Sequence, residues 1–433
     1  MRWTLACFTL ASILAGCGNK GVVTSAVAAR APVRTGIQAV SRSGTHTNRF
    51  VVKYKAAASQ AAIRSLHQRL ALRTGHDISS IGVSVLEMTN RALPQGVFAK
   101  LQSHSAVEYV EQASIFQVPR RPSRKQLPPS GRRLQNVGMG DPLWNEPQWG
   151  LLKIGMPLVW NRFRGSPQVT VAIIDTGVDP VHPDLSGSIV PGASVVGGTT
   201  GPDDDHGHGT HVAGVVAASI FDGRGLNGVA PNCRIMPIKV LNREGRGDTG
   251  DIVAGLVWAV NHGAKVVNMS LGGTGGSRAL MDAVRYAQSK DVLIVAAMGN
   301  EGSNSQEYPA GYPGVMAVGA TDRDDQKADF SNYGSWISVS APGVDILSTL
   351  PTRPVGVTRL EGKSVGQDVM DGTSMAAPFV SGVAALIRSA YPNLSAPQVK
   401  NRIERTSDDH GSPGFDEHFG WGRINATRAL NLR

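Results

Sequence analysis

Four long apolar runs constrain the fold of this 433-residue chain more than any other feature of its sequence. Apolar runs without polar alternation are typical of strands that are buried on both faces of a sheet. Segments with apolar residues at helical spacing separate the runs, and this alternation predicts a mostly parallel sheet between two layers of helices. We therefore expect an α/β three-layer sandwich over residues 141–433. The apolar runs are residues 169–177, 234–241, 264–271 and 292–299, and the helical segments are residues 211–220, 251–262 and 278–289.

A smaller unit precedes this domain, over residues 48–118. Its segments predict a β-α-β-β-α-β unit, which is a small α+β domain of the ferredoxin-like type. Residues 119–140, dense in Pro, Gly and Arg, predict an exposed linker. The strand-like segments of the small unit are residues 49–55, 82–88 and 107–118, and its helical segments are residues 59–73 and 96–104.

The first 17 residues predict export. An arginine precedes a twelve-residue, mostly apolar run that is too short to span a bilayer, so we expect a secretory signal. The signal ends in Leu14-Ala15-Gly16-Cys17, which resembles a bacterial lipobox with a lipid-modified cysteine; the alternative is a plain signal peptide with a chance cysteine. Residues 18–47 predict a flexible tether. Removal of the signal removes Cys7 and leaves Cys233 as a free thiol, so we expect no disulfide framework in the mature chain.

The net charge of +10 would suit a nucleic-acid partner, but its distribution argues against one. Residues 1–140 contain 19 Lys and Arg against 4 Asp and Glu, a net charge of +15. Residues 141–433 contain 24 against 29, a net charge of −5. The basic excess lies outside the larger domain, and we expect no nucleic-acid partner.

Three polar residues far apart in the sequence have the chemistry of nucleophilic catalysis. Asp175 ends the first apolar run, where a carboxylate costs free energy unless it is paired. His208 lies in HGHGTH at a predicted helix start, and Ser374 lies in MDGTSMAAPFVSG. Because proline is tolerated in about the first turn of a helix, Pro378 predicts a helix that begins at about Ser374. A serine nucleophile needs an imidazole base, which in turn needs a carboxylate, and the three need to be neighbours only in space.

Each of these residues also has a simpler interpretation. A serine before a helix is most often an ordinary N-cap. The histidines could bind a metal, but ligand histidines on a helix usually occur as H-x-x-x-H with an acid, and the sequence nominates no further ligands. GTSMA also lacks the G-x-S-x-G elbow of the α/β-hydrolases. We expect the acidic run at residues 203–205 to be an exposed loop rather than an ion site.

Five motifs, in order over the C-terminal two-thirds of the chain, resemble the subtilisin family of serine peptidases. They are AIIDTGVDPVHPDL, HGHGTHVAG, NMSLGG, AAMGNEG and DGTSMAAPFVSG. The resemblance implies the subtilisin-like fold, with Asp175 orienting the imidazole, His208 as general base and acid, and Ser374 as nucleophile. It further implies that Asn300 donates to the oxyanion, with the Ser374 N–H as second donor, and that His211 is not catalytic.

The resemblance also implies a cleft in which a peptide lies extended between two edges of the chain. Glu307 is similar in position to the floor of the pocket for the P1 side chain, where an acid would favour Lys or Arg; the alternative is a solvated loop glutamate. The first edge consists of Gly245, Arg246 and Gly247, and the second edge of Ser270, Leu271 and Gly272. The walls of the P1 pocket are the second edge together with Ala297, Met298 and Gly299.

A structural calcium site is implied by similarity to thermitase-like subtilases. Carboxylates from distant parts of a sequence suit a hard cation that needs six to eight oxygen ligands. The alternative is a set of ordinary surface aspartates. The implied carboxylate ligands are Asp141, Asp184 and Asp222, and the implied carbonyl ligands are those of Ser219, Arg224 and Leu226. We expect this ion to affect stability rather than catalysis.

The sequence as a whole predicts an exported, lipid-anchored, calcium-stabilised serine endopeptidase that is made as a zymogen. Residues 48–118 resemble the subtilisin propeptide, a folding aid and inhibitor, and Arg120-Arg121 and Arg132-Arg133 are candidate processing sites. The expected partners are peptide substrates, the propeptide and, through Cys17, a membrane. We expect a monomer without a catalytic cofactor. One alternative is a catalytically inactive lipoprotein that uses the fold to bind peptides, and another is a dedicated processing protease rather than a broad degrader.

Overall fold

The structure, a computed structural model, describes residues 48–119 and 148–432 except for residues 91, 221 and 224. The predicted signal, lipobox cysteine, tether and linker, together with Asp141 and Arg224, lie outside the described residues. Among the helices of the described ranges, none is both long enough and apolar enough to cross a membrane.

The N-terminal unit is an α+β domain with one antiparallel four-stranded sheet in the order β2-β3-β1-β4. The predicted helix at 59–73 is shorter than expected, because it ends at Arg69 and strand β2 begins at Leu72. The predicted strand at 107–118 is two strands, β4 and β5, and only β4 belongs to this sheet. The elements are β1 (Arg49–Tyr54), α1 (Gln60–Arg69), β2 (Leu72–Ile78), η1 (Ser79–Ile81), β3 (Val83–Met88), α2 (Pro94–Gln102), β4 (Val107–Gln112) and β5 (Ile115–Gln117).

The larger domain is built on a seven-stranded sheet in the order β13-β12-β11-β10-β6-β8-β7, in which every pair is parallel. The predicted α/β class is therefore confirmed. Its strands are β6 (Thr170–Asp175), β7 (Ala193–Ser194), β8 (Arg234–Lys239), β10 (Val266–Met269), β11 (Leu293–Ala297), β12 (Met316–Thr321) and β13 (Val339–Pro342).

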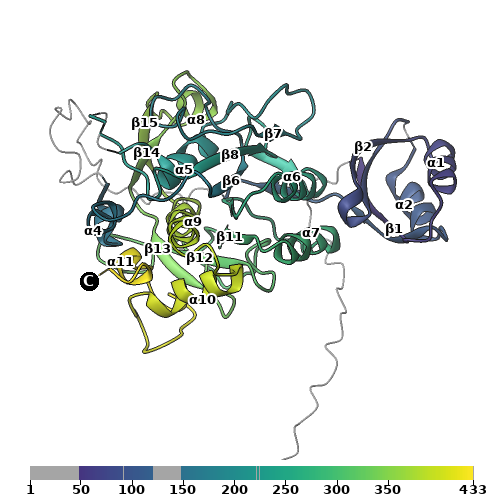
Figure 1. Cartoon of the computed structure of the whole chain (residues 1–433). Coiled ribbons are helices and arrows are strands. Elements are labelled where there is room, and N and C mark those ends of the chain that lie inside the picture. The colour runs from purple at the N-terminus through teal and green to yellow at the C-terminus, as the bar shows by residue number, and fades with distance from the viewer. Residues whose placement is uncertain (1–47, 91, 120–147, 221, 224, 433) are drawn as a thin grey trace, which may run out of the picture. The chain divides into compact units, whose positions relative to one another are not determined.

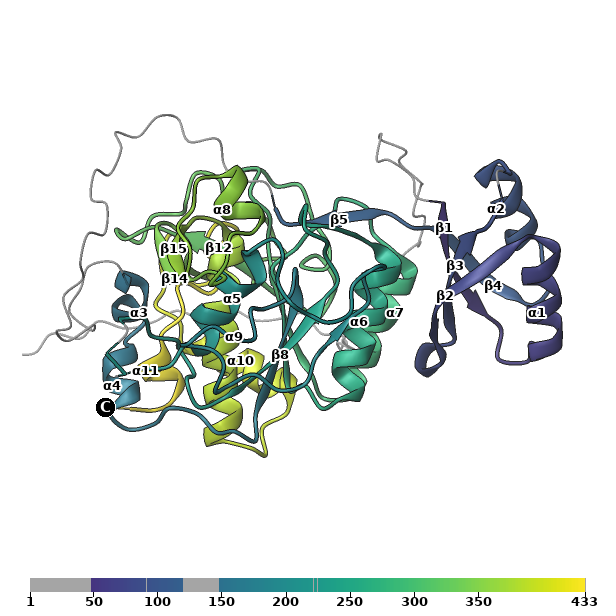
Figure 2. The same ribbon diagram turned by 90° about the horizontal axis from the view of Figure 1, so that it is seen from above.

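Helices cover both faces of this sheet (Figures 1 and 2). Alternate strand residues belong to two separate hydrophobic clusters: Val171 and Ile173 pack with α5 and α9, whereas Ala172 and Ile174 pack with α6 and α7. This alternation is the period-two pattern of a strand that is buried on both faces. The four helices are α5 (His208–Ala217), α6 (Thr249–Asn261), α7 (Arg278–Ser289) and α9 (Thr373–Ala390).

Shorter elements complete the domain. Three of them are strands that pair outside the main sheet: β9 pairs with β5, and β14 pairs with β15. They are α3 (Trp149–Lys153), α4 (Met156–Trp160), β9 (Arg246–Asp248), β14 (Ile346–Thr349), α8 (Gly356–Leu360), β15 (Gln367–Met370), α10 (Ala396–Thr406) and α11 (Ala426–Ala429).

Helix α9 carries Ser374 in its first turn and Pro378 in its second. A proline lacks the N–H that would bond to the carbonyl four residues earlier, so the Ser374 carbonyl has no helical donor. The Ser270 hydroxyl, which follows β10, donates to this carbonyl at 2.8 Å. The helix defect therefore creates the bond that ties the start of α9 to the carboxyl end of the sheet.

A buried chain of hydrogen bonds extends this connection. Asn268 Nδ2 donates to the Ser270 Oγ at 2.9 Å, and the Ser381 hydroxyl donates to Asn268 Oδ1 at 2.8 Å. All three side chains are buried, and a buried polar network that is satisfied throughout favours one arrangement of its members. Strand β10 thus contacts α9 at two positions, and the register between helix and sheet is fixed.

Candidate functional site

Asp175 and His208 meet at the carboxyl end of β6. His208 is the first residue of α5, and its Nδ1 lies 2.8 Å from Asp175 Oδ1. Both side chains are at most 1% exposed, so this bond lies in a medium of low dielectric constant. The close approach of α5 to the sheet requires Gly209, where an added Cβ would lie 2.1 Å from the Gly177 carbonyl oxygen.

Asp204 holds this helix in place, a role that the sequence did not reveal. The expectation of an exposed acidic loop at 203–205 is wrong for Asp204, which is fully buried. Its carboxylate accepts from the Gly207 and Thr210 N–H groups at the start of α5 and from the Thr176 hydroxyl after β6. The N-cap position itself is Gly207, three residues after Asp204, so the ordinary capping pattern of a sequence does not point to Asp204.

Ser374 and Asn300 are linked through Thr373. Asn300 Oδ1 accepts from both the Thr373 N–H and the Thr373 hydroxyl, at 2.9 Å each. An amide whose oxygen is held in this way has its two N–H donors fixed in direction. Sequence reasoning did not single out Thr373, although it directly precedes Ser374.

The donors predicted for an oxyanion border a space in front of Gly372. A Cβ built on Gly372 would lie 3.1 Å from Asn300 Nδ2 and 3.6 Å from the Ser374 backbone nitrogen. Gly372 also has a φ of 146°, in the region that favours glycine. The two donors therefore converge on a position that any side chain at residue 372 would fill.

The Ser374 hydroxyl donates to the Ser270 carbonyl oxygen at 3.3 Å. The buried His208 Nε2 has no hydrogen-bond partner within the described ranges. The predicted nucleophile and base are consequently not hydrogen-bonded to one another in this arrangement. Rotation of the serine side chain about χ1 is required before a proton can pass from Oγ to Nε2.

His211 lies one turn further along α5 and points into the core. Its Nε2 lies 3.0 Å from the Ile346 carbonyl oxygen and 3.2 Å from that of Asp368, and its side chain is fully buried. These contacts connect α5 to the β14–β15 pair. In the structure, His211 Nε2 therefore faces the β14–β15 pair rather than Asp175.

The two predicted cleft edges lie on either side of strand β5. Phe116 pairs with Gly247 and Gln117 with Arg246 in an antiparallel ladder, while the Val118 N–H donates to the Gly245 carbonyl at 2.9 Å. On the other side, Gln117 and Gly272 exchange both backbone hydrogen bonds, at 3.1 and 3.0 Å. The segment after the N-terminal domain thus lies as an added strand between the edges, in the manner expected of a bound peptide.

Glu307 lies between the segments predicted as walls of the P1 pocket. A Cβ on Gly272 would lie 2.1 Å from Glu307 Oε2, and a Cβ on Gly299 would lie 3.1 Å from Glu307 Cδ. Glu307 is 7% exposed, so it is not a solvated loop residue. Burial, followed by the nearby charge and hydrogen bond of Glu301, raises the pKa of Glu307 to about 8.

The remaining wall residues are buried beside it. Leu271 and Met298 are fully buried, Ala297 is the last residue of β11, and Gly299 has a φ of 107°. Ser270 is also fully buried and bonds to Ser374 through both its hydroxyl and its carbonyl group.

A hollow next to His208 adds residues that sequence reasoning missed. It is lined by Val118 and Pro119 of the added strand and by His206 and Glu361 of the larger domain. Burial and the neighbouring His208 lower the pKa of His206. His206 Nδ1 accepts from the His208 N–H at 3.3 Å, so His206 also helps to orient the start of α5.

The predicted calcium ligands are brought together in part. Asp184 is 5% exposed, and its carbonyl accepts from the Ser219 N–H and hydroxyl at 2.9 and 3.2 Å. The loop that begins at Ser219 contains Asp222 and ends at Leu226. Among the described residues, no group of three or more His, Cys, Asp or Glu that could hold a metal is present, and the third predicted carboxylate, Asp141, lies outside them.

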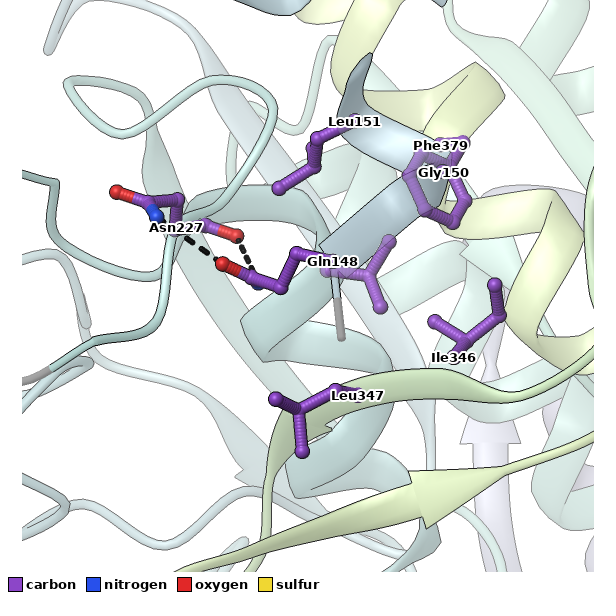
Figure 3. A pocket seen from close by; sticks show the side chains of 8 residues that line it. Gln148, Gly150, Leu151, Asn227, Ile346, Leu347 and Phe379 are labelled. Carbon is purple, nitrogen blue, oxygen red and sulfur yellow. Dashed lines mark hydrogen bonds between the residues drawn. The ribbon is translucent and has the colours of Figure 1, made fainter. Parts of the chain in front are cut away.

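The end of this loop is attached to the first described residue of the larger domain. Gln148 Nε2 donates to the Asn227 carbonyl, and Asn227 Nδ2 donates to Gln148 Oε1, both at 3.0 Å (Figure 3). Gln148 follows Asp141 by seven positions. Gln148 is thereby held next to the loop that contains the other predicted ligands.

Comparison with known proteins identifies the family. The subtilase family model matches residues 166–422, which is more than half of the chain, and the model of the fervidolysin N-terminal prodomain matches residues 35–112. The chain therefore belongs to the subtilase family, whose members are subtilisin-type serine endopeptidases, and it carries an N-terminal prodomain. The predicted family and the subtilisin-like fold are confirmed.

Individual relatives agree with this assignment. The chain is 37% identical over 336 residues to a thermophilic serine proteinase from Bacillus sp. (strain AK1), covering 78% of this chain and 76% of that protein. It is 40% identical over 290 residues to thermitase from Thermoactinomyces vulgaris, covering 67% and 98%. The crystal structure of fervidolysin from Fervidobacterium pennivorans, a keratinolytic enzyme related to subtilisin, matches with a TM-score of 0.76 at 31% identity and covers 90% of this chain. This chain spans 62% of the length of the fervidolysin chain.

The space in front of Gly372 gives the first prediction. Gly372→Ala should lower kcat about 100-fold or more, because the methyl group would occupy the position of the oxyanion between Asn300 and Ser374. The measurement is kcat on a peptide amide, with circular dichroism to confirm folding. Gly187→Ala, where an added Cβ meets nothing within 4 Å, is the matched control and should keep its activity. A folded Gly372→Ala variant with undiminished kcat would contradict the placement of the donors.

Proposed function

We propose that this chain is a serine endopeptidase in which Asp175, His208 and Ser374 hydrolyse peptide bonds by way of an acyl-enzyme. The observation that carries the proposal is the buried Asp175–His208 hydrogen bond beside a cleft in which β5 lies as an added strand. The neighbouring Asn300 amide, fixed by Thr373, supports the proposal because such a donor stabilises a tetrahedral oxyanion.

The geometry supports the following sequence of steps. Asp175 accepts the His208 Nδ1–H, which leaves a lone pair on Nε2. The Ser374 hydroxyl turns from Ser270 toward Nε2 and gives up its proton as Oγ bonds to the peptide carbonyl carbon. Asn300 Nδ2 and the Ser374 N–H bind the oxyanion. The imidazolium then protonates the leaving amine as the C–N bond breaks. A water molecule, deprotonated by His208, next bonds to the acyl carbon. The imidazolium returns this proton to Ser374 Oγ as the ester bond to Oγ breaks, which releases the new carboxylic acid.

Glu307 supports a preference for Lys or Arg at P1. Its carboxyl group lies beside Gly272, the residue whose backbone pairs with Gln117 of the added strand. A side chain that extends from this strand toward Gly299 would meet an acid in a site of low exposure, where an opposite charge is worth more than in water. A basic P1 residue is therefore the substrate feature that this pocket fits best.

The contacts of the prodomain support a zymogen in which it acts as an intramolecular inhibitor. The Glu111 carboxylate accepts from the Arg278 N–H and the Ser277 hydroxyl, at 2.5 and 2.7 Å, and so caps the N-terminus of α7. Arg49 binds Asp248 at 2.5 Å and Asp251 at 2.9 Å, at the start of α6. These charge-assisted bonds hold the domain next to the cleft edge while its tail occupies the cleft.

The rival function is a catalytically inactive lipoprotein that binds peptides in the same cleft. A fluorophosphonate probe separates the two, because it reacts with a serine that is activated by an adjacent base. After maturation, the probe should label Ser374, and Ser374→Ala and His208→Ala should both abolish labelling and peptide hydrolysis. Ser289→Ala, which changes an exposed hydroxyl, is the control and should label as the wild type does. A folded protein without label on Ser374 would favour the binding module.

We also propose that the Asp184 loop binds a structural calcium ion. Subtilisins generally bind structural calcium, and the donors that are described here are the oxygen ligands that calcium prefers. Asp184 and Asp222 would supply carboxylates and Leu226 a carbonyl, with Asp141, Arg224 and Ser219 completing the predicted set. The ion would neutralise a nearly buried carboxylate and attach the N-terminal segment to the loop.

Calcium should therefore raise the melting temperature. With the ion at about 100 times its Kd, binding adds about 2.7 kcal/mol of stability, which is roughly 5–10 °C for a domain of this size. Chelation should reverse this shift in a Ser374→Ala background, which prevents self-digestion. Asp184→Asn should remove the response, whereas Asp324→Asn, at an exposed carboxylate, should retain it. An unchanged melting temperature on chelation would count against the site.

Export and anchoring complete the proposal. The predicted signal at residues 1–17 supports export, and the lipobox pattern supports a lipid anchor on Cys17. Acyl mass on Cys17 of the purified protein would support the anchor, and its absence would refute it. Maturation within the basic linker at an arginine pair would agree with a basic P1 preference.

A further inference from the structure

Glu307 shares the floor of the proposed P1 pocket with a second acid, Glu301. A Cβ on Gly299 would lie 2.9 Å from Glu301 Oε2 and 3.1 Å from Glu307 Cδ, so both carboxyl groups lie against the same backbone position. After burial, Glu301 raises the pKa of Glu307 both through its charge and as a hydrogen-bond partner of the Glu307 carboxyl group. A bond between two carboxyl groups needs a proton, because two ionised carboxylates have no donor between them.

The rest of the structure holds the two acids together. Asn332 Nδ2 donates to Glu301 Oε2 at 2.9 Å, and Asn332 Oδ1 accepts from the Glu301 N–H at 3.0 Å. Tyr308, next to Glu307, pairs with Gly273 through two backbone hydrogen bonds at 3.1 and 2.9 Å. Asn332 therefore holds the Glu301 carboxylate, and the backbone pairing of Tyr308 fixes where the Glu307 side chain starts. Glu307 is buried, whereas Glu301 is an exposed residue at the edge of the same site.

Among the described residues, no positively charged side chain is paired with Glu301 or Glu307. Segments 115–119 and 270–276 contain no titratable side chain. Lys327, the cation on the neighbouring segment, points its Nζ to the carbonyl oxygens of Ala328 and Ser331. The other titratable groups on the adjoining segments are Tyr308, Tyr312, Asp329 and Tyr333. In the described part of the chain, Glu301 is the charged group that acts on Glu307.

We propose that Glu301 and Glu307 share one proton at the floor of the P1 pocket, and that loss of this proton switches the pocket toward cationic P1 side chains. This inference rests on the proposed endopeptidase function and on its basic P1 pocket. With the proton in place, the pair carries one negative charge and can donate a hydrogen bond to a neutral P1 group. Without it, two negative charges face the pocket, and a guanidinium or ammonium group is needed to balance them.

The burial-raised pKa of Glu307, about 8, places the switch in mildly alkaline solution. Since kcat/KM reports the ionisation of the free enzyme, it is the parameter in which the switch should appear. The two acids interact, so the midpoint belongs to the pair rather than to Glu307 alone. Bound Arg should also displace the proton, so binding of a basic substrate near neutral pH should release protons into solution.

The test uses the matured enzyme and two peptides that differ only in arginine or citrulline at P1. The ratio of their kcat/KM values cancels every pH effect that the two substrates share, including any effect on stability. In the wild type, the arginine-to-citrulline ratio should rise about tenfold between pH 6.5 and 9 and then level. Glu307→Gln should give a low, flat ratio, and Glu301→Gln should move the midpoint to lower pH. Glu417→Gln, at an exposed carboxylate, should reproduce the wild-type profile.

A second measurement does not depend on activity. A folded-state pKa of about 8 lies above the usual value of an unfolded glutamate, so the folded protein holds the extra proton and loses stability as pH rises toward 8. We therefore compare Glu307→Gln with its parent, both in the Ser374→Ala background. The melting temperature of Glu307→Gln minus that of the parent should be larger at pH 8.5 than at pH 5. If this difference in melting temperature were the same at pH 5 and at pH 8.5, the proposal of a shared proton would be wrong.

Different results would refute the proposed protease function, the basic P1 pocket and the shared proton. A protein that neither cleaves peptides nor reacts with the phosphonate would fail the proposed function itself. Cleavage with no preference for arginine at any pH would refute the basic P1 pocket. A preference for arginine that is independent of pH, or that keeps its pH dependence in Glu307→Gln, would leave the protease intact and refute the proton-sharing pair.

Discussion

The fully buried Asp175 carboxylate is the constraint on which the arrangement of the site depends. A carboxylate at the end of an apolar strand is costly unless donors surround it, and Asp175 Oδ1 receives the Thr176 N–H at 2.7 Å as well as His208. The His208 donor is available only if α5 begins directly against the end of β6. Asp204 and the absent side chain of Gly209 make this approach possible. The local fold around the imidazole thus follows from the need to satisfy one acid.

A second constraint comes from the proline of α9. Pro378 leaves the Ser374 carbonyl to the Ser270 hydroxyl, and Ser270 also forms part of the cleft edge. The residue proposed to attack the substrate and the edge proposed to bind it are therefore parts of one buried network that continues to Asn268 and Ser381. Preorganisation of this kind spares the enzyme the reordering of its site during the reaction.

Much of the fold could be predicted from the sequence, because apolar runs as long as residues 264–271 and 292–299 are typical of buried strands and not of exposed segments. The prediction of one strand over residues 107–118 was wrong at its end, where β5 is a separate strand that pairs with β9. This partner lies about 130 residues away in the sequence, so the local pattern of residues does not indicate the pairing. Motifs led to the separate members of the site, but not to their supports. Asp204, in an acidic run, had the composition of an exposed loop, and the partnership of Glu301 with Glu307 depends on a turn that brings the two acids back together. Burial decided the case of Asp204, and the approach of an exposed Glu301 to a buried Glu307 decided the other; both are properties of the folded chain.

The central claim is that Asp175, His208 and Ser374 act as one unit on a peptide carbonyl. Single and double replacements test this claim most directly. If residues act as one unit, replacing one member already removes most of the activity, so replacing a second member lowers kcat little further. The measurement is kcat on one peptide amide for His208→Ala, Ser374→Ala and the double variant, each with its fold confirmed. The account predicts that the three lose the same activity within a small factor. If the losses of the two single variants instead multiply in the double variant, the residues act independently and the account is contradicted.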